Sequence, residues 1–549
     1  MNQPRFPKTG LALAITALAA GAGHVTPAQA SGPVLAEFQV NSPSSTPQVQ
    51  PKVAMDADGD FVVVWVSYFQ DDPASSSGRG VYAQRYNAAG AAQGGEFRVN
   101  TYTTGIQANA AVAMDADGDF VVAWSGEGVG DSEGIFAQRF NATGTPQGGE
   151  FLVNAVTTGS QLNPVVATEA NGDFAVGWIS NAQGGGLQFD VFAKRYTAAG
   201  AAIGGEFQVN TFTTGLQAGL AIAMDADGDF VMGWQSGGTQ DGDNYGIYAQ
   251  RYNNAGAAVG GEFRVNTYTT GAQIGPVAAM DRDGDFIVGW QSRGQDGDDF
   301  GIYAQRYNAA GTPQGAEFQV STYTTSTQGG TAVGMDADGD FVVSWGSFGQ
   351  DGDGYGVYAQ RYNAAGVARG GEQHVSTYTT SQQVGPAIAL DADGDFVVAW
   401  RSEAQDLLGS TGIYAQRYQA DTLTPSLTVT TSGAATNTTP VAGGPGGTYS
   451  FNAQFCNNTA LTMTGLSSKT LTLTNGNNLL NRTRDAFAAP GAAAIPAGGV
   501  GTEKDLTAAN GYTDLSLTNG ECVTVPYQIG LTNRNQFNFT IRIRGDNGL

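Results

Sequence analysis

The seven tryptophans of this 549-residue chain lie at nearly equal intervals. The spacing between consecutive tryptophans is 54 to 59 residues, so each one marks a copy of the same unit. They are Trp65, Trp124, Trp178, Trp234, Trp290, Trp345 and Trp400. A fixed period of this length predicts a repeat architecture. A feature that all seven copies share is therefore better explained as scaffold than as a functional site.

Each copy contains four short segments with strand character. In copy 4 they are Leu220–Met224, Phe230–Trp234, Ile247–Tyr252 and Glu262–Asn266, and turn residues such as Asp-Gly and Gly-Gly separate them. Such a pattern predicts an antiparallel four-stranded sheet. The second strand is nearly all apolar, as expected when both of its faces are covered. The first strand consists of small apolar residues, which fit the crowded centre of radially packed sheets. We therefore predict an all-β, seven-bladed β-propeller.

The two ends of the repeat array predict how the ring closes. An orphan copy of the fourth strand, Glu37–Asn41, precedes the first copy, and the seventh copy ends at Tyr418 without a fourth strand. The N-terminal strand can complete the seventh blade, which would remove the exposed sheet edges of an open array. An open solenoid is the alternative arrangement.

The segments outside the repeats predict export and a second domain. Residues 1–30 resemble a signal peptide, with a basic start, an apolar run over residues 10–23 and an Ala-Gln-Ala site for cleavage after Ala30. That run is too short to span a bilayer. We expect a secreted or cell-surface protein with the propeller over residues 31–421 and an immunoglobulin-like β-sandwich over residues 422–549. In an exported chain the only two cysteines, Cys456 and Cys522, favour a disulfide.

The formal charge of −24 excludes several classes of partner. An acidic surface repels nucleic acid and anionic lipid, and it attracts cations. We therefore expect no nucleic-acid partner, no insertion into a membrane and a monomeric protein.

The most frequent motif, D-x-D-G-D, follows the first strand of six copies; copy 3 has Glu169, Asn171 and Asp173 instead. Clustered carboxylates suit Ca²⁺, so these loops are candidate calcium sites. The alternative is an Asp-Gly turn in which the aspartate accepts backbone N–H groups, and the spacing does depart from that of an EF-hand. The candidate ligands are Asp56, Asp58, Asp60, Asp115, Asp117, Asp119, Asp225, Asp227, Asp229, Asp281, Asp283, Asp285, Asp336, Asp338, Asp340, Asp391, Asp393 and Asp395.

A second acidic segment follows most of the tryptophans and differs between copies. In a propeller it lies on the same face as the TYTTGxQ connections, and loops that vary over a uniform scaffold commonly carry specificity. It is the candidate binding face. Its candidate residues are Asp71, Asp72, Asp241, Asp243, Asp296, Asp298, Asp351 and Asp353.

Two further patterns have structural interpretations. The arginine near the end of each third strand and the glutamate that starts each fourth strand predict a ladder of cross-strand ion pairs. Beyond the signal segment there is a single histidine, His374, which leaves little scope for a histidine-dependent triad. Paired carboxylates are abundant, so residue type alone leaves glycoside hydrolysis open.

The unit DADGDFVVxWxSxGQDGDxYGIYAQRYNAAGxxxGGEFxVNTYTTGxQ, repeated over Glu37–Tyr418, resembles tandem repeats of large bacterial secreted and cell-surface proteins. Those repeats often accompany hemolysin-type calcium-binding (RTX) segments. The DADGDF loop is also similar, more weakly, to the acidic loops of FG-GAP/integrin-type propellers. The resemblance implies an extracellular location and does not specify a reaction.

Together these observations favour a secreted binding or adhesion protein that is not an enzyme. Its propeller loops would be presented to an extracellular glycan or protein. No cofactor is certain, and Ca²⁺ is the one candidate. The alternatives are a propeller enzyme acting on extracellular polysaccharide, as a glycosidase or lyase, and a purely structural envelope or matrix protein.

Overall fold

The computed structural model describes Pro33 and residues 36–419, apart from 43–44, 72–77, 184–187, 239 and 407–409, together with the backbone of several strands in a second unit. The first unit comprises Gly32–Ala420, and the second comprises Met1–Ser31 with Asp421–Leu549. All regular structure in the described residues is β-strand. No helix there is both long and apolar enough to cross a bilayer.

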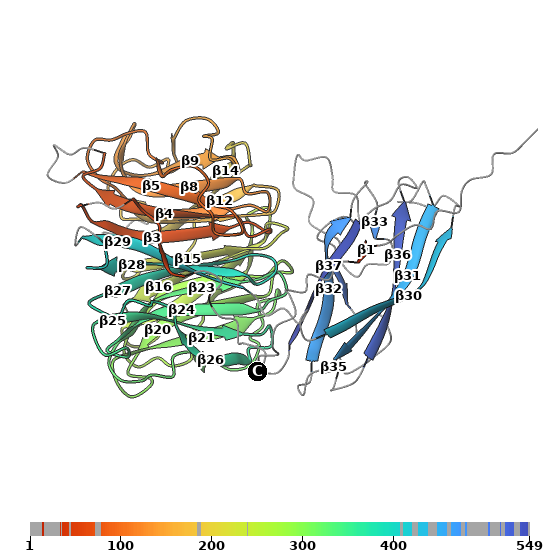
Figure 1. The fold of residues 1–549 in the computed structure, drawn as a ribbon. Helices are drawn as coiled ribbons and strands as arrows, with labels where there is room; N and C mark the ends of the chain where they lie inside the picture. Colours follow the sequence, from red (N-terminus) through yellow and green to blue (C-terminus); the bar gives the residue numbers. More distant parts are fainter. Residues whose placement is uncertain are drawn as a thin grey trace, which may run out of the picture. The chain divides into compact units, whose positions relative to one another are not determined.

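Seven antiparallel four-stranded sheets, the blades, make up the first unit (Figure 1). The inner strands of blades 1 to 7 are β3 (Gln48–Met55), β7 (Gln107–Met114), β11 (Gln161–Thr168), β15 (Gln217–Met224), β19 (Gln273–Met280), β23 (Gln328–Met335) and β27 (Gln383–Leu390). The second strands are β4 (Phe61–Tyr68), β8 (Phe120–Gly128), β12 (Phe174–Ser180), β16 (Phe230–Gly237), β20 (Phe286–Arg293), β24 (Phe341–Phe348) and β28 (Phe396–Glu403).

The third and outer strands complete each blade. The third strands are β5 (Arg79–Tyr86), β9 (Asp131–Phe140), β13 (Asp190–Tyr196), β17 (Tyr245–Tyr252), β21 (Phe300–Tyr307), β25 (Tyr355–Tyr362) and β29 (Thr411–Tyr418). The outer strands are β6 (Phe97–Arg98), β10 (Phe151–Leu152), β14 (Ala202–Gln208), β18 (Ala258–Arg264), β22 (Phe318–Gln319), β26 (Ala368–His374) and, in blade 7, β2 (Phe38–Gln39).

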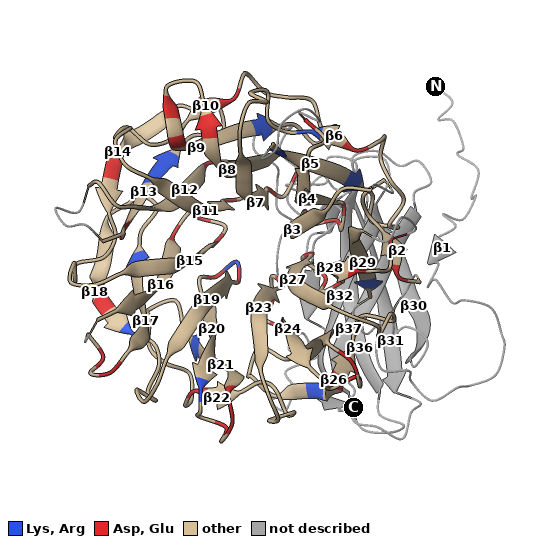
Figure 2. Cartoon of the chain, turned by 90° about the vertical axis from the view of Figure 1, so that its left-hand side faces the viewer, with Lys and Arg blue, Asp and Glu red and all other residues tan. Residues whose placement is uncertain are grey.

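The ring is closed as the sequence predicts. Strand β2 pairs with β29 of blade 7, and the side chain of Asn41 accepts the N–H of Ile413 at 2.7 Å. Each inner strand contacts the next, and β27 of blade 7 contacts β3 of blade 1. In Figure 2 the seven inner strands surround a common axis. The seven-bladed propeller is confirmed, and the open solenoid is excluded.

The tryptophans belong to the scaffold. All seven side chains are buried, each with at most 1% of its surface exposed. In blades 1 and 4 the glutamine that begins the inner strand accepts the indole N–H: Gln48 Oε1 lies 3.0 Å from Trp65 Nε1, and Gln217 Oε1 lies 3.0 Å from Trp234 Nε1. Truncation of a buried tryptophan costs about 3–5 kcal/mol.

Seven hydrophobic clusters fill the spaces between neighbouring blades. Each second strand contributes to the clusters on both of its sides, which is why it is apolar throughout. The closing cluster combines Val53 and Trp65 of blade 1 with Val397 and Ala399 of blade 7. Its composition is like that of the other six, so blade 7 packs on blade 1 as any blade packs on its neighbour.

The predicted ladder of arginine–glutamate ion pairs is wrong for Arg85 and Glu96 of blade 1. Glu96 accepts the backbone N–H of Ser42 at 2.8 Å through one carboxylate oxygen and the Gln70 amide at 2.9 Å through the other. Arg85 donates to the carbonyl of Thr143 in blade 2 at 2.7 Å. Backbone groups of an adjacent blade therefore bind both side chains, and the two charges join blades instead of pairing within one.

The second unit contains two sheets. One has the order β30 (Leu427–Asn437), β31 (Gly447–Asn457), β36 (Cys522–Leu531) and β33 (Asn478–Leu479). The other has the order β1 (Ala14–Ile15), β37 (Asn538–Asp546), β32 (Met463–Leu473) and β34 (Glu503–Asp505), and β35 (Ser516–Leu517) also pairs with β32. The immunoglobulin-like type and the signal peptide remain predictions.

The predicted disulfide concerns two strands of this unit. Cys456 on β31 is the direct register partner of Cys522 on β36. Residues opposite each other in antiparallel strands have Cα atoms about 4.5–5.5 Å apart, a separation that a disulfide can span. The bond itself lies outside the described side chains and stays a prediction.

Candidate functional site

The D-x-D-G-D loops form tight turns held by their first aspartate. In blade 1 the Oδ1 atom of Asp56 accepts the N–H of Asp58 at 3.0 Å and the N–H of Asp60 at 2.9 Å. The first aspartate makes the same pair of bonds in the other five D-x-D-G-D copies. This is the geometry of the Asp-Gly turn that the sequence offered as the alternative to calcium.

The same carboxylates also connect different parts of the scaffold. Asp60 accepts the N–H of Ala88, at 2.6 Å, from the turn between the third and outer strands of its own blade. The other oxygen of Asp56 faces the loop of blade 2, where a β-carbon on Gly118 would lie 3.0 Å from it. Gly118 has φ +86°, so glycine is required there both for its backbone conformation and for space.

Burial makes these first carboxylates hard to ionise. Burial and the neighbouring Asp60 raise the pKa of Asp56 to about 7, and burial raises the pKa of Asp115 and of Asp281 to about 6. Among the described residues, no group of three or more histidine, cysteine or acidic side chains is arranged to hold a metal ion. Calcium binding by these loops stays a prediction of the sequence, and unfolding temperatures with Ca²⁺ and with chelator test it.

The aspartates of the candidate binding face hold their own loops. Asp71 accepts the hydroxyl of Tyr82 at 2.5 Å and the amide of Asn100 at 2.6 Å. In blades 4, 5 and 6 the aspartate at the start of this loop lies against the glycine near the start of the third strand and accepts the N–H of the aspartate two residues on, as Asp241, Asp296 and Asp351 do. Asp72 lies outside the described residues.

The second aspartates of these loops reach the next blade. Asp243 accepts the N–H of Gly271 at 2.7 Å, Asp298 accepts that of Ser326 at 2.8 Å, and Asp353 accepts that of Ser381 at 3.1 Å. Each acceptor therefore fixes the connection into the following blade. The structure brings the predicted carboxylates to one face but uses them as supports for its loops.

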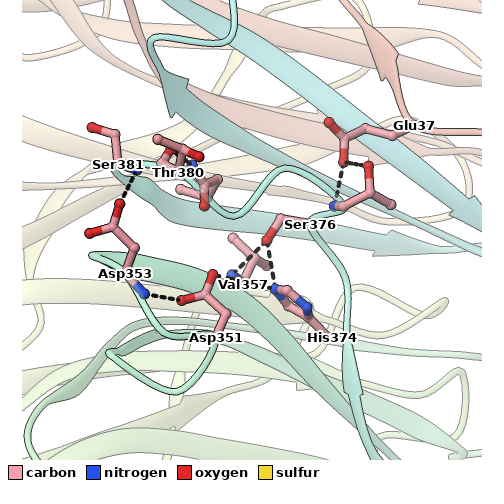
Figure 3. Close-up of polar contacts among 10 residues, drawn as sticks. Glu37, Asp351, Asp353, Val357, His374, Ser376, Thr380 and Ser381 are labelled. Atoms are coloured by element: carbon pink, nitrogen blue, oxygen red, sulfur yellow. Dashed lines mark hydrogen bonds and ion pairs between the residues drawn. The ribbon is translucent and has the colours of Figure 1, made fainter.

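A serine, a histidine and an aspartate meet in blade 6 (Figure 3). His374 Nε2 lies 3.2 Å from Ser376 Oγ and 3.7 Å from Asp351 Oδ2. A catalytic triad uses one ring nitrogen for the serine and the other for the carboxylate, whereas here one nitrogen faces both. The Ser376 hydroxyl is buried and accepts the N–H of Val357 at 3.1 Å, the bond that Asn100 makes in blade 1. This cluster supports a loop and does not form a nucleophile.

The inner strands differ among blades at one position near the axis. Every inner strand has a bulge in its first half, and one bulge residue takes a positive φ. In blades 4 to 7 it is glycine, with φ of 59° to 65°: Gly219, Gly275, Gly330 and Gly385. In blades 1 to 3 it is Gln50, Asn109 or Asn163, with φ of 56°, 52° and 52°. A side chain in this conformation costs about 1 kcal/mol or more, least for asparagine.

Two of these amides bind each other across the junction of blades 1 and 2. Gln50 Nε2 donates to Asn109 Oδ1 at 3.0 Å, and Gln50 Oε1 accepts the N–H of Asn109 at 3.3 Å. The Asn109 amide nitrogen also donates to Ser125 Oγ at 3.2 Å. Gln50 and Asn163 are exposed, and Asn109 is half-buried.

Lys52 lies two residues beyond Gln50 on the same inner strand. The other six copies have alanine or valine at this position. The side chain is accessible to solvent, and because β3 is flanked by β4, β7 and β27 this solvent is at the axis. Partial desolvation by the neighbouring strands lowers the pKa of Lys52. No acidic side chain among the described residues forms an ion pair with Lys52.

Arg401 brings a second cation toward the same place. It directly follows the tryptophan of blade 7, and Gln235, at the same position in blade 4, accepts the N–H of the bulge residue Gly275 of blade 5 at 2.9 Å. This position therefore faces the bulge of the following blade, which for blade 7 is Gln50 in blade 1. Arg401 donates to Glu403 at 2.7 Å, and its side chain is 30% exposed.

We name Gln50, Lys52, Asn109, Asn163 and Arg401 the axial cluster. An amine with a lowered pKa can accept and return a proton. Arginine and amide N–H groups can hold an anion or stabilise developing negative charge. The arrangement thus has both elements of a catalytic or ligand-binding site, on the side of the ring formed by blades 7, 1, 2 and 3.

The sequence contains signals for this cluster that lie outside its repeated motifs. Lys52 stands in the segment PKVAM, which the overall pattern of the seven first strands made look apolar. The bulge column reads Gln, Asn, Asn, Gly, Gly, Gly, Gly when the seven copies are aligned. A search for positions that break the repeat by gaining a polar group would have found both.

The known proteins that match this chain resemble it only distantly. No family model and no curated protein matches the chain. Solved structures that match include a protein of unknown function from Dyadobacter fermentans, with 11% identity over 72% of this chain and 100% of that one, at a TM-score of 0.43. An ulvan lyase of polysaccharide lyase family PL25 matches with 10% identity over 70% and 96% of the two chains, at a TM-score of 0.41.

Another match is the GH93 α-L-arabinofuranosidase of Fusarium graminearum, with 12% identity over 57% of this chain and 93% of that one, at a TM-score of 0.39. The prediction that this chain is not an enzyme is corrected by these comparisons, because the matching structures include glycoside hydrolases and polysaccharide lyases. At such identities and TM-scores they assign no substrate and no reaction to this chain.

Proposed function

We propose that this protein is an extracellular enzyme that acts on a polysaccharide, with the axial cluster as its active site. The observation that carries the proposal is the contrast between the bulge residues of the seven blades. Glycine serves the scaffold in four blades, whereas Gln50, Asn109 and Asn163 keep side chains in a conformation that glycine adopts at lower cost. Backbone strain of this kind is concentrated at functional sites.

Aromatic side chains on one face of the propeller also suit a saccharide. The second strand of each blade ends on the face where the inner strands begin, and aromatic side chains lie there in blades 6 and 1. Phe348 is 42% exposed and packs against Tyr355, with ring centroids 5.1 Å apart. Tyr68 packs against Phe69, and Arg79 lies 4.4 Å from the centre of the Tyr68 ring. Aromatic rings with one polar end suit sugar rings, which are apolar on their faces and polar at their edges.

The residues of the cluster have distinct roles in this proposal. Lys52 is the proton acceptor or donor, since it is the one described inner-strand residue with an ionisable amine. Arg401 and the amides of Gln50, Asn109 and Asn163 bind and orient the sugar. The expected secretion signal places the enzyme outside the cell, where polysaccharides are the abundant polymers.

Incubation of the purified protein with a panel of neutral, uronate-containing and sulfated polysaccharides tests the proposal. New reducing ends report chain cleavage, and the ultraviolet absorbance of unsaturated sugars distinguishes elimination from hydrolysis. We expect cleavage of at least one polymer, and a loss of about a hundredfold or more in the Lys52→Ala variant.

The matched control is Gln291→Ala. Gln291 follows the tryptophan of blade 5, at the same position as Arg401 in blade 7, and faces the glycine bulge of blade 6. This variant should keep the full rate. Absence of cleavage across the panel, or an equal rate for Lys52→Ala and the unaltered protein, would contradict the proposal.

A further inference from the structure

The chemistry of the axial cluster narrows the class of saccharide. We infer that the cluster binds an oxyanion carried by the sugar, of the kind that the carboxylate of a uronic acid or a sulfate ester supplies. This inference rests on the function proposed above and adds the substrate class to it. Three features of the described residues support it: free amide N–H donors, an unpaired guanidinium nitrogen, and the lack of a counter-charge for Lys52.

The first feature is a supply of free donors. Gln50 and Asn109 have one side-chain oxygen each, and both oxygens already accept a hydrogen bond from the partner residue. Each amide nitrogen carries two N–H groups and makes one hydrogen bond among the described residues, from Gln50 to Asn109 and from Asn109 to Ser125. One N–H group of each amide therefore remains to donate to an oxygen of the ligand.

The second feature lies on Arg401. One terminal nitrogen donates to Glu403 at 2.7 Å, but the Nε atom is buried and has no hydrogen-bond partner among the described residues. A buried donor without a partner costs about 1–3 kcal/mol. Guanidinium groups bind carboxylate and sulfate oxygens through two adjacent N–H groups, so an oxyanion can satisfy the one that the protein leaves unpaired.

The third feature is the uncompensated charge of Lys52. The chain has 49 acidic and 25 basic side chains, yet none of the described acidic groups forms an ion pair with Lys52. Lys52 is exposed to the solvent at the axis, and the described part of the chain supplies no carboxylate that pairs with its charge. In so acidic a protein, a cation at the axis that no described carboxylate approaches is suited to a counter-charge from the ligand.

Titration calorimetry with the full chain tests the inference. The probes are an oligogalacturonate hexamer, a sulfated galactan oligosaccharide of the same length and a neutral cello-oligosaccharide of the same length. We expect at least tenfold tighter binding of one anionic probe than of the neutral one. The probe that binds identifies the source of the oxyanion as carboxylate or sulfate.

Two variants and one control locate the binding. Lys52→Met keeps the length of the side chain and removes its charge, and Arg401→Gln removes the guanidinium; each should weaken binding of the anionic probe at least tenfold. Arg293→Gln, on the rim of blade 5 with 64% of its side chain exposed, should leave the affinity unchanged. Unaltered unfolding temperatures of the variants show that each still folds.

Failure of this inference is distinguishable from failure of the proposed function. Equal affinity for anionic and neutral probes, binding that Lys52→Met does not change, or no binding of any probe overturns the inference. Cleavage of a neutral polysaccharide that still requires Lys52 would overturn it while the proposed function stands. Binding of an anionic probe at Lys52 without cleavage of any polymer would support it while the proposed function fails.

Discussion

Blades 1 to 3 and blades 4 to 7 have the same scaffold and different inner surfaces. In both groups a buried tryptophan fills the blade, the first loop carboxylate holds a tight turn, and a glutamate joins neighbouring blades. At the axis, however, blades 4 to 7 have glycine at the bulge, whereas blades 1 to 3 have Gln50, Asn109 and Asn163. Lys52 and Arg401 lie beside the group with side chains.

This difference indicates that the repeated scaffold residues and the residues of the axial cluster lie at different positions of the unit. The repeated tryptophans are buried in the scaffold, and the first aspartates of the D-x-D-G-D loops hold their own turns. The positions that depart from the repeat by gaining a polar group are few and lie together. Substitutions in the two groups of blades should therefore affect stability alike and ligand chemistry differently.

The largest effect on stability should be the same in both groups. Trp65→Ala in blade 1 and Trp290→Ala in blade 5 each remove a fully buried indole, and we expect each to lower the free energy of unfolding by about 3–5 kcal/mol. Thermal unfolding of the two variants side by side measures this. A loss in blade 1 that greatly exceeds the loss in blade 5 would show that the scaffold is not equivalent in the two groups.

The next effect should appear only in ligand binding or turnover. We expect the double variant Gln50→Gly/Asn109→Gly to lose at least tenfold in turnover of the cleaved polysaccharide, because two of the proposed sugar-binding amides are gone. Its unfolding temperature should stay within a few degrees of the original, since relief of the positive-φ conformation offsets the lost hydrogen bonds. A sharp fall in unfolding temperature would mean that these amides are structural.

The first aspartates of the D-x-D-G-D loops should make the free energy of unfolding depend on pH in the same direction in both groups. Burial raises the folded-state pKa of Asp56 to about 7 and of Asp281 to about 6, above the ordinary 3.8 of the unfolded chain. The folded state thus binds these protons more tightly, and the stability they confer is complete below about pH 4 and lost as the pH rises through 6 to 7. Unfolding free energies should therefore be higher at pH 5 than at pH 8.

Asparagine at either position should reduce this pH dependence. Asp56→Asn and Asp281→Asn keep the oxygen that accepts the two backbone N–H groups but cannot ionise, so each should shrink the difference between pH 5 and pH 8 by about 1 kcal/mol. Denaturant titrations at the two pH values, with Asp58→Asn as the exposed control, give the comparison. An unchanged difference in both variants would refute the assignment.

The smallest effect is the reverse substitution in the glycine group. Gly275→Asn introduces a side chain at φ 62°, where a β-carbon would lie 2.7 Å from the flexible end of Gln291. We expect a loss of about 0.5–1 kcal/mol in stability and no change in turnover. A change in turnover as large as that of the Gln50→Gly/Asn109→Gly variant would show that the axial site extends into blade 5.

The periodic part of this structure could be predicted from the sequence, but the grouping of the site residues in space could not. Repeated tryptophans, alternating strands and the orphan Glu37–Asn41 segment determine blades and closure, because each depends on local patterns present seven times. The roles of Asp56 and Glu96 depend on which backbone N–H groups lie near their oxygens, and spacing alone does not reveal this. Lys52 and Arg401 are far apart in sequence, and only ring closure brings blade 7 beside blade 1.

The most direct test of the central claim is a crystal structure of the protein with a bound oligosaccharide taken from the polymer that it cleaves or binds. The account predicts sugar density at the axis beside blades 7, 1 and 2, with a sugar oxygen within hydrogen-bond distance of Lys52 Nζ or of the Asn109 amide. Sugar bound instead at the glycine bulges of blades 4 to 6, or among the D-x-D-G-D turns, would contradict it.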